Sequence, residues 1–310
     1  MEQEICEQPA VLAKNANDYF DATREFLAGQ EFDMVLLAAR GSSDNAALYA
    51  RYLIEIHLGI PVSLAAPSVI TRYQSKMKYP KTLAIGISQS GAAPDVSEVL
   101  GFMRSQGHTT IAITNTAGSR LTQVADATVL LNAGDENSIA ATKTYTSSLL
   151  ALYQVIRAMG AELDDPIGSL PTESWLESCR KQAASACGHI VRCSPVFCLG
   201  RGYSYCTAVE TALKLMECAL ISAKSYSTAD FEHGPKALAS HGTACIVSGE
   251  IPDGLTATGS VVIPVPAGTE GALAPIWNIF FGQWIALLAA RARGLNPDRA
   301  QNLRKVTETL

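Results

Sequence analysis

The sequence lacks the features of several large protein classes. Only 17% of its 310 residues are charged, the net charge is −5 and no basic run occurs, which disfavours binding to nucleic acids. The N-terminal stretch MEQEICEQPAV has no apolar core of the kind found in a secretory signal. The longest apolar stretch, residues 276–290, is interrupted by polar residues and is too short to span a bilayer, so it predicts a buried helix. We therefore expect a cytoplasmic protein without nucleic acid or membrane partners.

Common metal and cofactor motifs are also missing. The eight cysteines are scattered and form no CxxC pair, so we expect reduced core thiols rather than disulfides or a zinc site. No GxxxxGK[ST] phosphate loop is present. The turn GISQSG lacks the second glycine of a hydrolase nucleophile elbow, and GRGYSYCTA has Tyr205 where a dinucleotide-binding fingerprint needs glycine. We expect neither a metal nor an organic cofactor.

What the sequence does contain is one segment that occurs twice. Residues 36–56, LLAARGSSDNAALYARYLIEI, align at a constant offset with residues 197–217, FCLGRGYSYCTAVETALKLME. Each copy has the pattern of a short apolar strand, a Gly-Ser turn and a long helix. The repeat therefore predicts two α/β domains of similar plan.

Apolar strand-like runs alternate with helical stretches around both copies of the segment. The first copy has MVLLAA, PVSLAA, LAIGIS, TTIAIT and ATVLLN, and the second has PVFCLG, TACIVS and SVVIPVP. This alternation predicts two tandem doubly wound, flavodoxin-like α/β domains, each a parallel sheet with helices on both faces. The predicted boundaries are a helical arm at 1–28, a first domain at 29–159, a linker at 160–173, a second domain at 174–294 and a tail at 295–310.

Small polar residues fill the turn after the strand expected at 83–87. This turn reads Ser88-Gln89-Ser90-Gly91, and a helix is expected to follow from Pro94. Ligands of open parallel sheets gather at the carboxyl ends of strands, where free backbone N–H groups and the helix dipole favour anions. A helix cap would explain one serine, but the matching turn Gly41-Ser42-Ser43 favours a phosphate site built from neutral donors.

Two further sets of polar residues are candidates for acid–base chemistry. Glu210, Lys214 and Glu217 lie at i, i+4 and i+7 on one helix face. They could be a solvated stripe with weak pairing, or buried groups with shifted pKa values suited to proton transfer, and the sequence leaves both open. His233, followed by Gly-Pro, has the turn chemistry of a fixed imidazole, although incidental loop histidines are more common.

Six motifs, taken together, resemble the double sugar-isomerase (SIS) family. They are ARGSS, ISQSGAAPD, NAGDENSIAATKTYT, GRGYSY…ALKLME, HGP and NLRKVT, and they occur in order over nearly the whole chain. They are most similar to the isomerase half of glucosamine-6-phosphate synthase and to SIS-type glucosamine-6-phosphate deaminases.

This resemblance implies roles for particular residues. The sugar phosphate would bind the two Gly-Ser turns, Ile139 would touch the sugar through its backbone, and Glu210 and Lys214 would line the site. Glu217 would move a proton between C1 and C2, and Lys305 would form an imine with a ketose. His233 would assist ring opening, in the synthase from a partner subunit, which implies a homodimer. The implied phosphate-binding residues are Ser42, Ser43, Ser88, Gln89 and Ser90.

Two positions depart from the synthase pattern, and one domain is missing. Ala93 replaces a phosphate-binding hydroxyl residue, and Ala229-Asp230 replaces Gly-Glu ahead of the histidine. The sequence leaves no room for a glutaminase domain, so we expect no use of glutamine. The resemblance then implies conversion of glucosamine 6-phosphate to fructose 6-phosphate and ammonia. The alternatives are a fructosamine-6-phosphate deglycase, another ketose or aldose phosphate isomerase, and a sugar-phosphate sensor without turnover.

Overall fold

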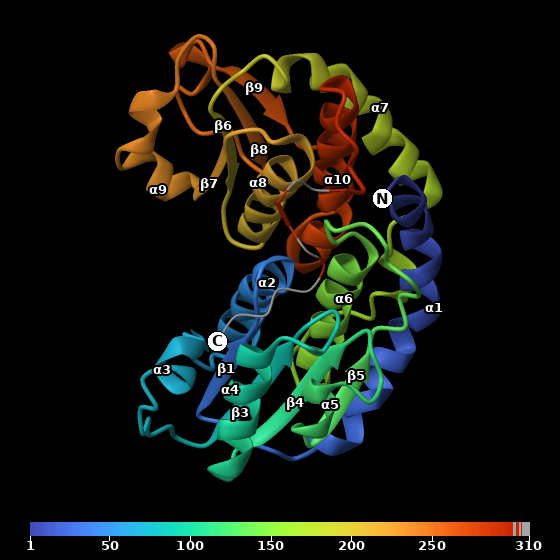
Figure 1. Ribbon diagram of the computed structural model, residues 1–310, viewed down its shortest axis with the longest axis vertical. Coiled ribbons are helices and arrows are strands. Elements are labelled where there is room, and N and C mark those ends of the chain that lie inside the picture. The colour runs from blue at the N-terminus through green and yellow to red at the C-terminus, as the bar shows by residue number, and fades with distance from the viewer. Residues whose placement is uncertain (300–301, 304, 306–310) are drawn as a thin grey trace. The chain divides into compact units, whose positions relative to one another are not determined.

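The structure, a computed structural model, describes residues 1–299, 302–303 and 305, which fall into two compact units (Figure 1). The first-sheet unit contains residues 10–135 and 144–168. The second-sheet unit contains residues 1–9, residues 136–143 and the described residues from 169 to 305. Each unit is built around one parallel β-sheet.

The first sheet has five parallel strands in the order β2-β1-β3-β4-β5, the flavodoxin-like order expected from the sequence. Every residue of β3 is buried, as continuous apolar runs predict for a parallel strand covered on both faces. The strands are β1 (Met34–Ala38), β2 (Val62–Leu64), β3 (Thr82–Ile87), β4 (Thr109–Thr114) and β5 (Ala127–Leu130).

Helices in the first half of the chain place apolar faces against this sheet. Val96, Val99, Leu100 and Met103 of α4 pack with Leu121 of α5 on inward side chains of β1, β3 and β4. The helix α1 begins at Glu2, within the helical arm predicted at 1–28, and contains Pro9. The helices are α1 (Glu2–Leu27), α2 (Ser42–His57), α3 (Pro67–Thr71), α4 (Pro94–Ser105), α5 (Arg120–Gln123), α6 (Lys143–Ala158) and the 3₁₀ turn η1 (Ile167–Ser169).

The second sheet has four parallel strands in the order β7-β6-β8-β9, which repeats the order of the first four strands of the first sheet. Three of the strands were expected from the sequence. The edge strand β7 was not, because its sequence AKSYS has no apolar run and only Ala223 is buried. The strands are β6 (Val196–Gly200), β7 (Ala223–Ser227), β8 (Ala244–Ser248) and β9 (Val261–Pro264).

One face of the second sheet is covered by long helices and the other by short ones. The long helices are α7 (Glu173–Ile190), α8 (Ser204–Ala219) and α10 (Ala274–Ala292), and α10 packs on both of the others. The other face packs around Phe197, Leu199 and Phe231. The short elements are α9 (Thr228–Glu232), η2 (Pro235–Leu238), η3 (Thr256–Thr258) and η4 (Gly271–Leu273).

The apolar helix near the end of the chain is a core helix, as its sequence predicted, but the expectation that the segment is too short to span a bilayer was wrong, because it extends beyond residues 276–290 at both ends. Residues 271–292 are long and apolar enough to cross a membrane, but 78% of the most apolar window is buried inside the protein. Trp284 and Phe280 of α10 are fully buried. Packing between α7 and α8 therefore explains the high hydropathy of this segment.

All eight cysteines are free, and five of them are buried. Burial raises the pKa of Cys179 to about 12, so this thiol stays protonated and unreactive at neutral pH. Among the described residues, no group of His, Cys, Asp and Glu side chains could hold a metal ion. The buried cysteines therefore act as small apolar core residues.

Candidate functional site

The two serine-containing turns leave neighbouring strands at the same edge of the first sheet. Ser42 and Ser43 begin α2 just after β1, and Ser88 directly follows β3. Ala38 of β1 pairs with Gly86 of β3 in the parallel register, so both strands end at the same edge. The chain leaves β1 toward β2 on one side and β3 toward β4 on the other, which makes this edge a topological switch point.

The turn after β3 is shaped by backbone hydrogen bonds to β4 and beyond. The Ser88 N–H donates to the Ile113 carbonyl oxygen (3.0 Å), and the Asn115 N–H donates to the Gln89 carbonyl oxygen (3.0 Å). Gly91 has a φ of +61°, and a Cβ there would lie 2.0 Å from Ser119 Oγ. Only glycine fits this position, so the turn has one defined backbone path.

The side chains of these turns are oriented but not sealed from solvent. Ser88 is buried, whereas Ser42, Ser43, Gln89 and Ser90 are half-buried. The Ser90 hydroxyl accepts a hydrogen bond from the Ala92 N–H (3.2 Å). Such hydroxyl and amide groups at a strand end can donate to a bound anion.

The arginine that precedes the first turn is already paired. Arg40 Nε donates to Asp95 Oδ2 at 2.6 Å, and the Asp95 carboxylate, in the first turn of α4, is 3% exposed. Much of the positive charge of Arg40 is therefore compensated within the protein. Ala93 caps α4 without a side-chain hydrogen bond, so it adds no donor. An anion at this edge would therefore depend on neutral donors, and the phosphate site expected from the sequence stays a prediction.

Lysine 214 lies between two carboxylates on α8 in the second-sheet unit. Its Nζ is 2.6 Å from Glu217 Oε2 and 3.3 Å from Glu210 Oε1. The side chains of Lys214 and Glu210 are fully buried, while that of Glu217 is 20% exposed. Burial alone would lower the pKa of Lys214, but Glu210 and Glu217 outweigh this effect and raise it. The ammonium form is therefore stabilised, and the solvated-stripe alternative does not hold for Glu210 and Lys214.

Lys305, another candidate catalytic residue of the second-sheet unit, forms an ion pair with a buried carboxylate. Lys305 Nζ donates to Glu136 Oε2 (3.1 Å) and to the Ser138 carbonyl oxygen, and the Glu136 side chain is fully buried. Ile139, the residue expected to touch the sugar, follows Ser138 and is half-buried. The structure thus brings Lys305 to the 136–143 segment. The role of Glu136 was missed, although it lies within the motif NAGDEN.

A second buried carboxylate, from the N-terminal helix, supports the same segment. Glu4 Oε1 accepts hydrogen bonds from the N–H groups of Asn137 (2.6 Å) and Ser138 (3.0 Å). Glu136 Oε1 accepts from the Thr142 N–H (2.9 Å). Two buried acids therefore fix the backbone around Ile139, a function that sequence spacing gave no means of assigning to Glu4.

His233 ends α9 and is exposed. Its backbone N–H donates to the Asp230 carbonyl oxygen (3.1 Å), and Ser227 Oγ caps the start of the helix by accepting from the Asp230 N–H (3.1 Å). No hydrogen bond or ion pair joins the His233 imidazole to the other residues that the structure describes. Its backbone position is fixed while its side chain points to solvent.

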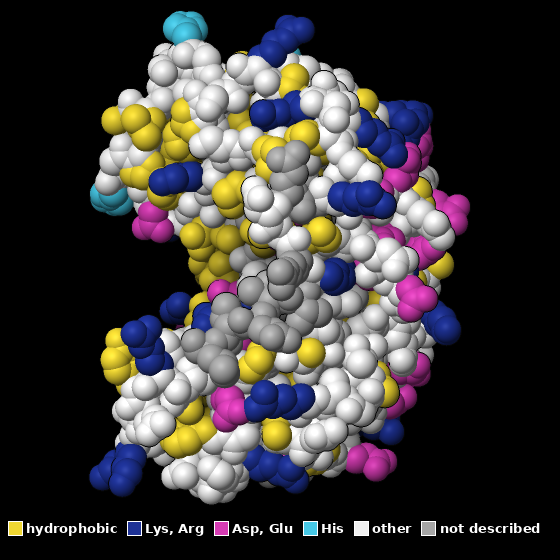
Figure 2. All heavy atoms as spheres, viewed as in Figure 1, with side chains coloured by type: hydrophobic (Ala, Val, Ile, Leu, Met, Phe, Trp, Pro, Cys, Tyr) yellow, Lys and Arg dark blue, Asp and Glu magenta, His cyan; other side chains and the backbone are white. Residues whose placement is uncertain are grey.

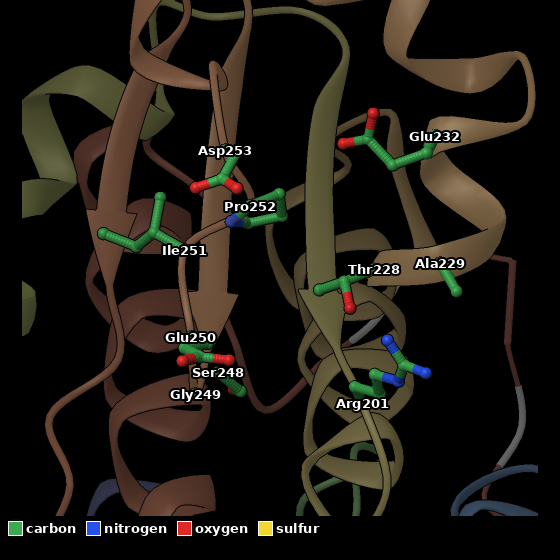
Figure 3. A pocket seen from close by; sticks show the side chains of 10 residues that line it. All are labelled: Arg201, Thr228, Ala229, Glu232, Ser248, Gly249, Glu250, Ile251, Pro252 and Asp253. Atoms are coloured by element: carbon green, nitrogen blue, oxygen red, sulfur yellow. The ribbon is translucent and has the colours of Figure 1, made fainter.

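A cavity of about 640 Å³ lies at the carboxyl edge of the second sheet (Figure 3). Its walls come from residues that follow β6, β7 and β8, including Arg201, Thr228 and Glu250. None of the candidate residues from the sequence lines it. Sequence reasoning missed this cavity because its lining comes from loops that are far apart in the chain.

Charged side chains elsewhere do not form a single strong patch on the face shown in Figure 2. Lys and Arg side chains there lie scattered among acidic ones. This distribution agrees with the absence of a basic run in the sequence. The described part of that face has no continuous basic surface that could bind a polyanion.

Known proteins resemble this chain in both sequence and fold. Residues 31–158 match the SIS domain family. Over 98% of its length the chain is 32% identical to the isomerizing glutamine–fructose-6-phosphate aminotransferase of Methanothermobacter thermautotrophicus, of which the match covers 56%. The chain therefore spans little more than half of that relative.

Two solved structures share the fold over nearly the whole chain. A protein assigned as a phosphosugar isomerase from Silicibacter pomeroyi superposes with a TM-score of 0.84 at 27% identity, covering 96% of this chain and 98% of that one. A glucosamine-6-phosphate deaminase from Thermotoga maritima superposes with a TM-score of 0.78 at 23% identity, covering 96% of this chain and 100% of that one. At 23% identity the second likeness establishes the fold alone.

Proposed function

We propose that the protein is a sugar phosphate isomerase of the SIS family, whose domain residues 31–158 match, and that its reaction is the deamination of glucosamine 6-phosphate. The observation that carries the proposal is the Glu217 carboxylate, partly exposed and 2.6 Å from the buried Lys214 ammonium. A carboxylate with a fixed orientation and access to solvent suits proton transfer to and from carbon. The relative named as an aminotransferase and the solved structure assigned as a phosphosugar isomerase support the substrate class.

The proposed chemistry needs one proton shuttle and one hydrolysis. Glu217 removes the proton from C2 of the open-chain amino sugar and returns it to C1, while the O1 oxygen gains a proton and the C2 amine becomes an imine. Water then adds to C2, and the C–N bond breaks to give fructose 6-phosphate and ammonia. The Lys214 ammonium, 2.6 Å from Glu217 Oε2, holds this carboxylate in a fixed orientation.

The remaining predicted residues take supporting roles in this proposal. The phosphate would be held by the serine turns of the first sheet, so that binding energy fixes the orientation of the reacting carbons. Lys305, held by Glu136, would act on the ketose product. His233 would assist ring opening, and its exposed imidazole supports an action across the subunits of a homodimer.

A substrate panel tests the reaction. We expect the purified protein to release ammonia from glucosamine 6-phosphate with an equal amount of fructose 6-phosphate, and to release far less from glucosamine, which has no phosphate. Conversion of a fructosamine 6-phosphate to glucose 6-phosphate without ammonia release from glucosamine 6-phosphate would support the deglycase alternative. Binding of these sugars without any product would support the sensor.

The serine turns give a second prediction. Ser43→Ala and Ser90→Ala should each raise KM for glucosamine 6-phosphate at least about tenfold, because a hydrogen bond to a charged group contributes about 1.5–3 kcal/mol. Steady-state kinetics would measure this, with Ser105→Ala, an exposed serine at the end of α4, as the matched control. An unchanged KM in both variants would mean that the phosphate binds elsewhere.

A further inference from the structure

The cavity of the second-sheet unit lies at the counterpart of the proposed phosphate edge. The strand order β7-β6-β8-β9 repeats β2-β1-β3-β4, so β6 and β8 correspond to β1 and β3. Arg201 follows β6, and Gly249 and Glu250 follow β8. Strand ends at such a switch point are where open parallel sheets bind ligands. The volume of about 640 Å³ falls within the range of about 300–1,000 Å³ that is usual for small-molecule sites.

The turns of the two copies also share backbone geometry. Gly41 after β1 and Gly202 after β6 have φ values of +58° and +56°, and each precedes a long helix. Serine 204 begins α8, and a Cβ at Gly249 would lie 3.8 Å from its hydroxyl oxygen. A hydroxyl donor and the positive end of α8 therefore lie near Gly249, one of the residues that line the cavity.

The cavity carries exposed side chains of both charge signs that form no ion pair with the described part of the protein. Among the described residues, no ion pair or hydrogen bond engages the side chains of Arg201, Glu250 or Asp253. Glu232, by contrast, is paired with Lys236 at 2.8 Å. Figure 3 shows Arg201 and Glu250 on opposite sides of the lower end of the cavity and Asp253 at its upper end.

We propose that this cavity is a second ligand site, which takes a small phosphorylated amine with hydroxyl groups. A phosphate alone would fit Arg201 but would face the carboxylates of Glu250 and Asp253, whereas a simple amine would face Arg201. A molecule that carries both groups places its phosphate on the guanidinium and its ammonium on the carboxylates. None of these residues has a part in the proposed turnover, so the site is independent of that reaction.

Calorimetric titration with glucosamine 6-phosphate tests the proposal. The full chain is used in the Glu217→Gln background, so that the probe is not consumed. We expect a binding event that Arg201→Ala weakens at least about tenfold, as for other hydrogen bonds to charged groups. Arg192→Ala, which removes an exposed arginine outside the cavity, should leave it unchanged. Thermal unfolding of each variant checks that the fold is retained.

The ammonium half of the proposal has its own variant. Glu250→Gln combined with Asp253→Asn should weaken the same event for glucosamine 6-phosphate about tenfold, while the weaker binding of glucose 6-phosphate there should be unchanged or improved, because glucose 6-phosphate has no ammonium group. An equal loss for both sugars would overturn the ligand class.

These experiments can test the second ligand site and the proposed deaminase reaction independently of each other. If Arg201→Ala binds glucosamine 6-phosphate with the stoichiometry and affinity of its Glu217→Gln parent, the second site does not exist. Ammonia release is measured separately on the protein with Glu217 intact. Arg201-dependent binding without ammonia release would uphold the site and reject the deaminase, and ammonia release without such binding would do the reverse.

Discussion

Glu217→Gln is expected to lower kcat for glucosamine 6-phosphate by about 10²–10⁴-fold, the usual contribution of a positioned general acid or base. Glutamine has nearly the same shape and can still accept a hydrogen bond from Lys214, whose Nζ lies 2.6 Å from the carboxylate. It cannot take a proton from carbon. The affinity for the sugar phosphate should therefore change little, which a coupled ammonia assay and calorimetry would measure together.

Two further experiments serve as controls for the Glu217→Gln measurement. Glu173→Gln, at an exposed glutamate at the start of α7, should keep the normal rate. Mixing Glu217→Gln with His233→Ala subunits should restore part of the activity if His233 acts across a dimer, because one site of each mixed dimer then has both residues. A normal kcat for Glu217→Gln would remove the proposed role of this carboxylate.

Lys214→Met should destabilise the second-sheet unit by about 3–5 kcal/mol, because it leaves the fully buried Glu210 carboxylate without its cationic partner. The three tryptophans, Trp175, Trp277 and Trp284, all lie in this unit. Urea unfolding followed by tryptophan fluorescence therefore reports on this part of the protein.

A double variant separates charge burial from packing. Glu210→Gln added to Lys214→Met removes the fully buried unpaired charge, leaves only the partly exposed Glu217 carboxylate without its lysine, and should recover part of the lost stability. Lys224→Met, at an exposed lysine on β7, should change stability by less than about 0.5 kcal/mol. If Lys214→Met unfolds at the urea concentration of the unsubstituted protein, the buried ion pairs do not stabilise the unit.

The contribution of Lys214 to the free energy of unfolding depends on pH, and the direction of this dependence can be predicted. The pKa of Lys214 is raised in the folded protein, so its stabilising contribution is fully present below the pKa of an unfolded lysine, about 10.4. The contribution is lost only as the pH rises through the higher folded value. The stability difference between the unsubstituted protein and Lys214→Met should therefore be constant from about pH 7 to pH 9 and decrease in stronger alkali.

Local patterns in the sequence were enough to predict the fold. Apolar runs predicted eight of the strands, the repeated segment predicted two sheets of similar order, and the hydropathy of residues 276–290 predicted a buried helix. The exception is β7, an edge strand whose residues AKSYS lack an apolar run. Strand and helix patterns are local properties, so a single chain displays them directly.

The environment of each polar residue was decided only by the tertiary structure. The sequence placed Glu210, Lys214 and Glu217 on one helix face, but whether that face meets solvent or protein depends on how α10 and the second sheet pack on α8. In the same way, Glu136 contacts Lys305, and loops after β6, β7 and β8 form one cavity. Burial and charge pairing arise from segments far apart in the chain, which is why residue spacing could predict the elements and the motifs but not these contacts.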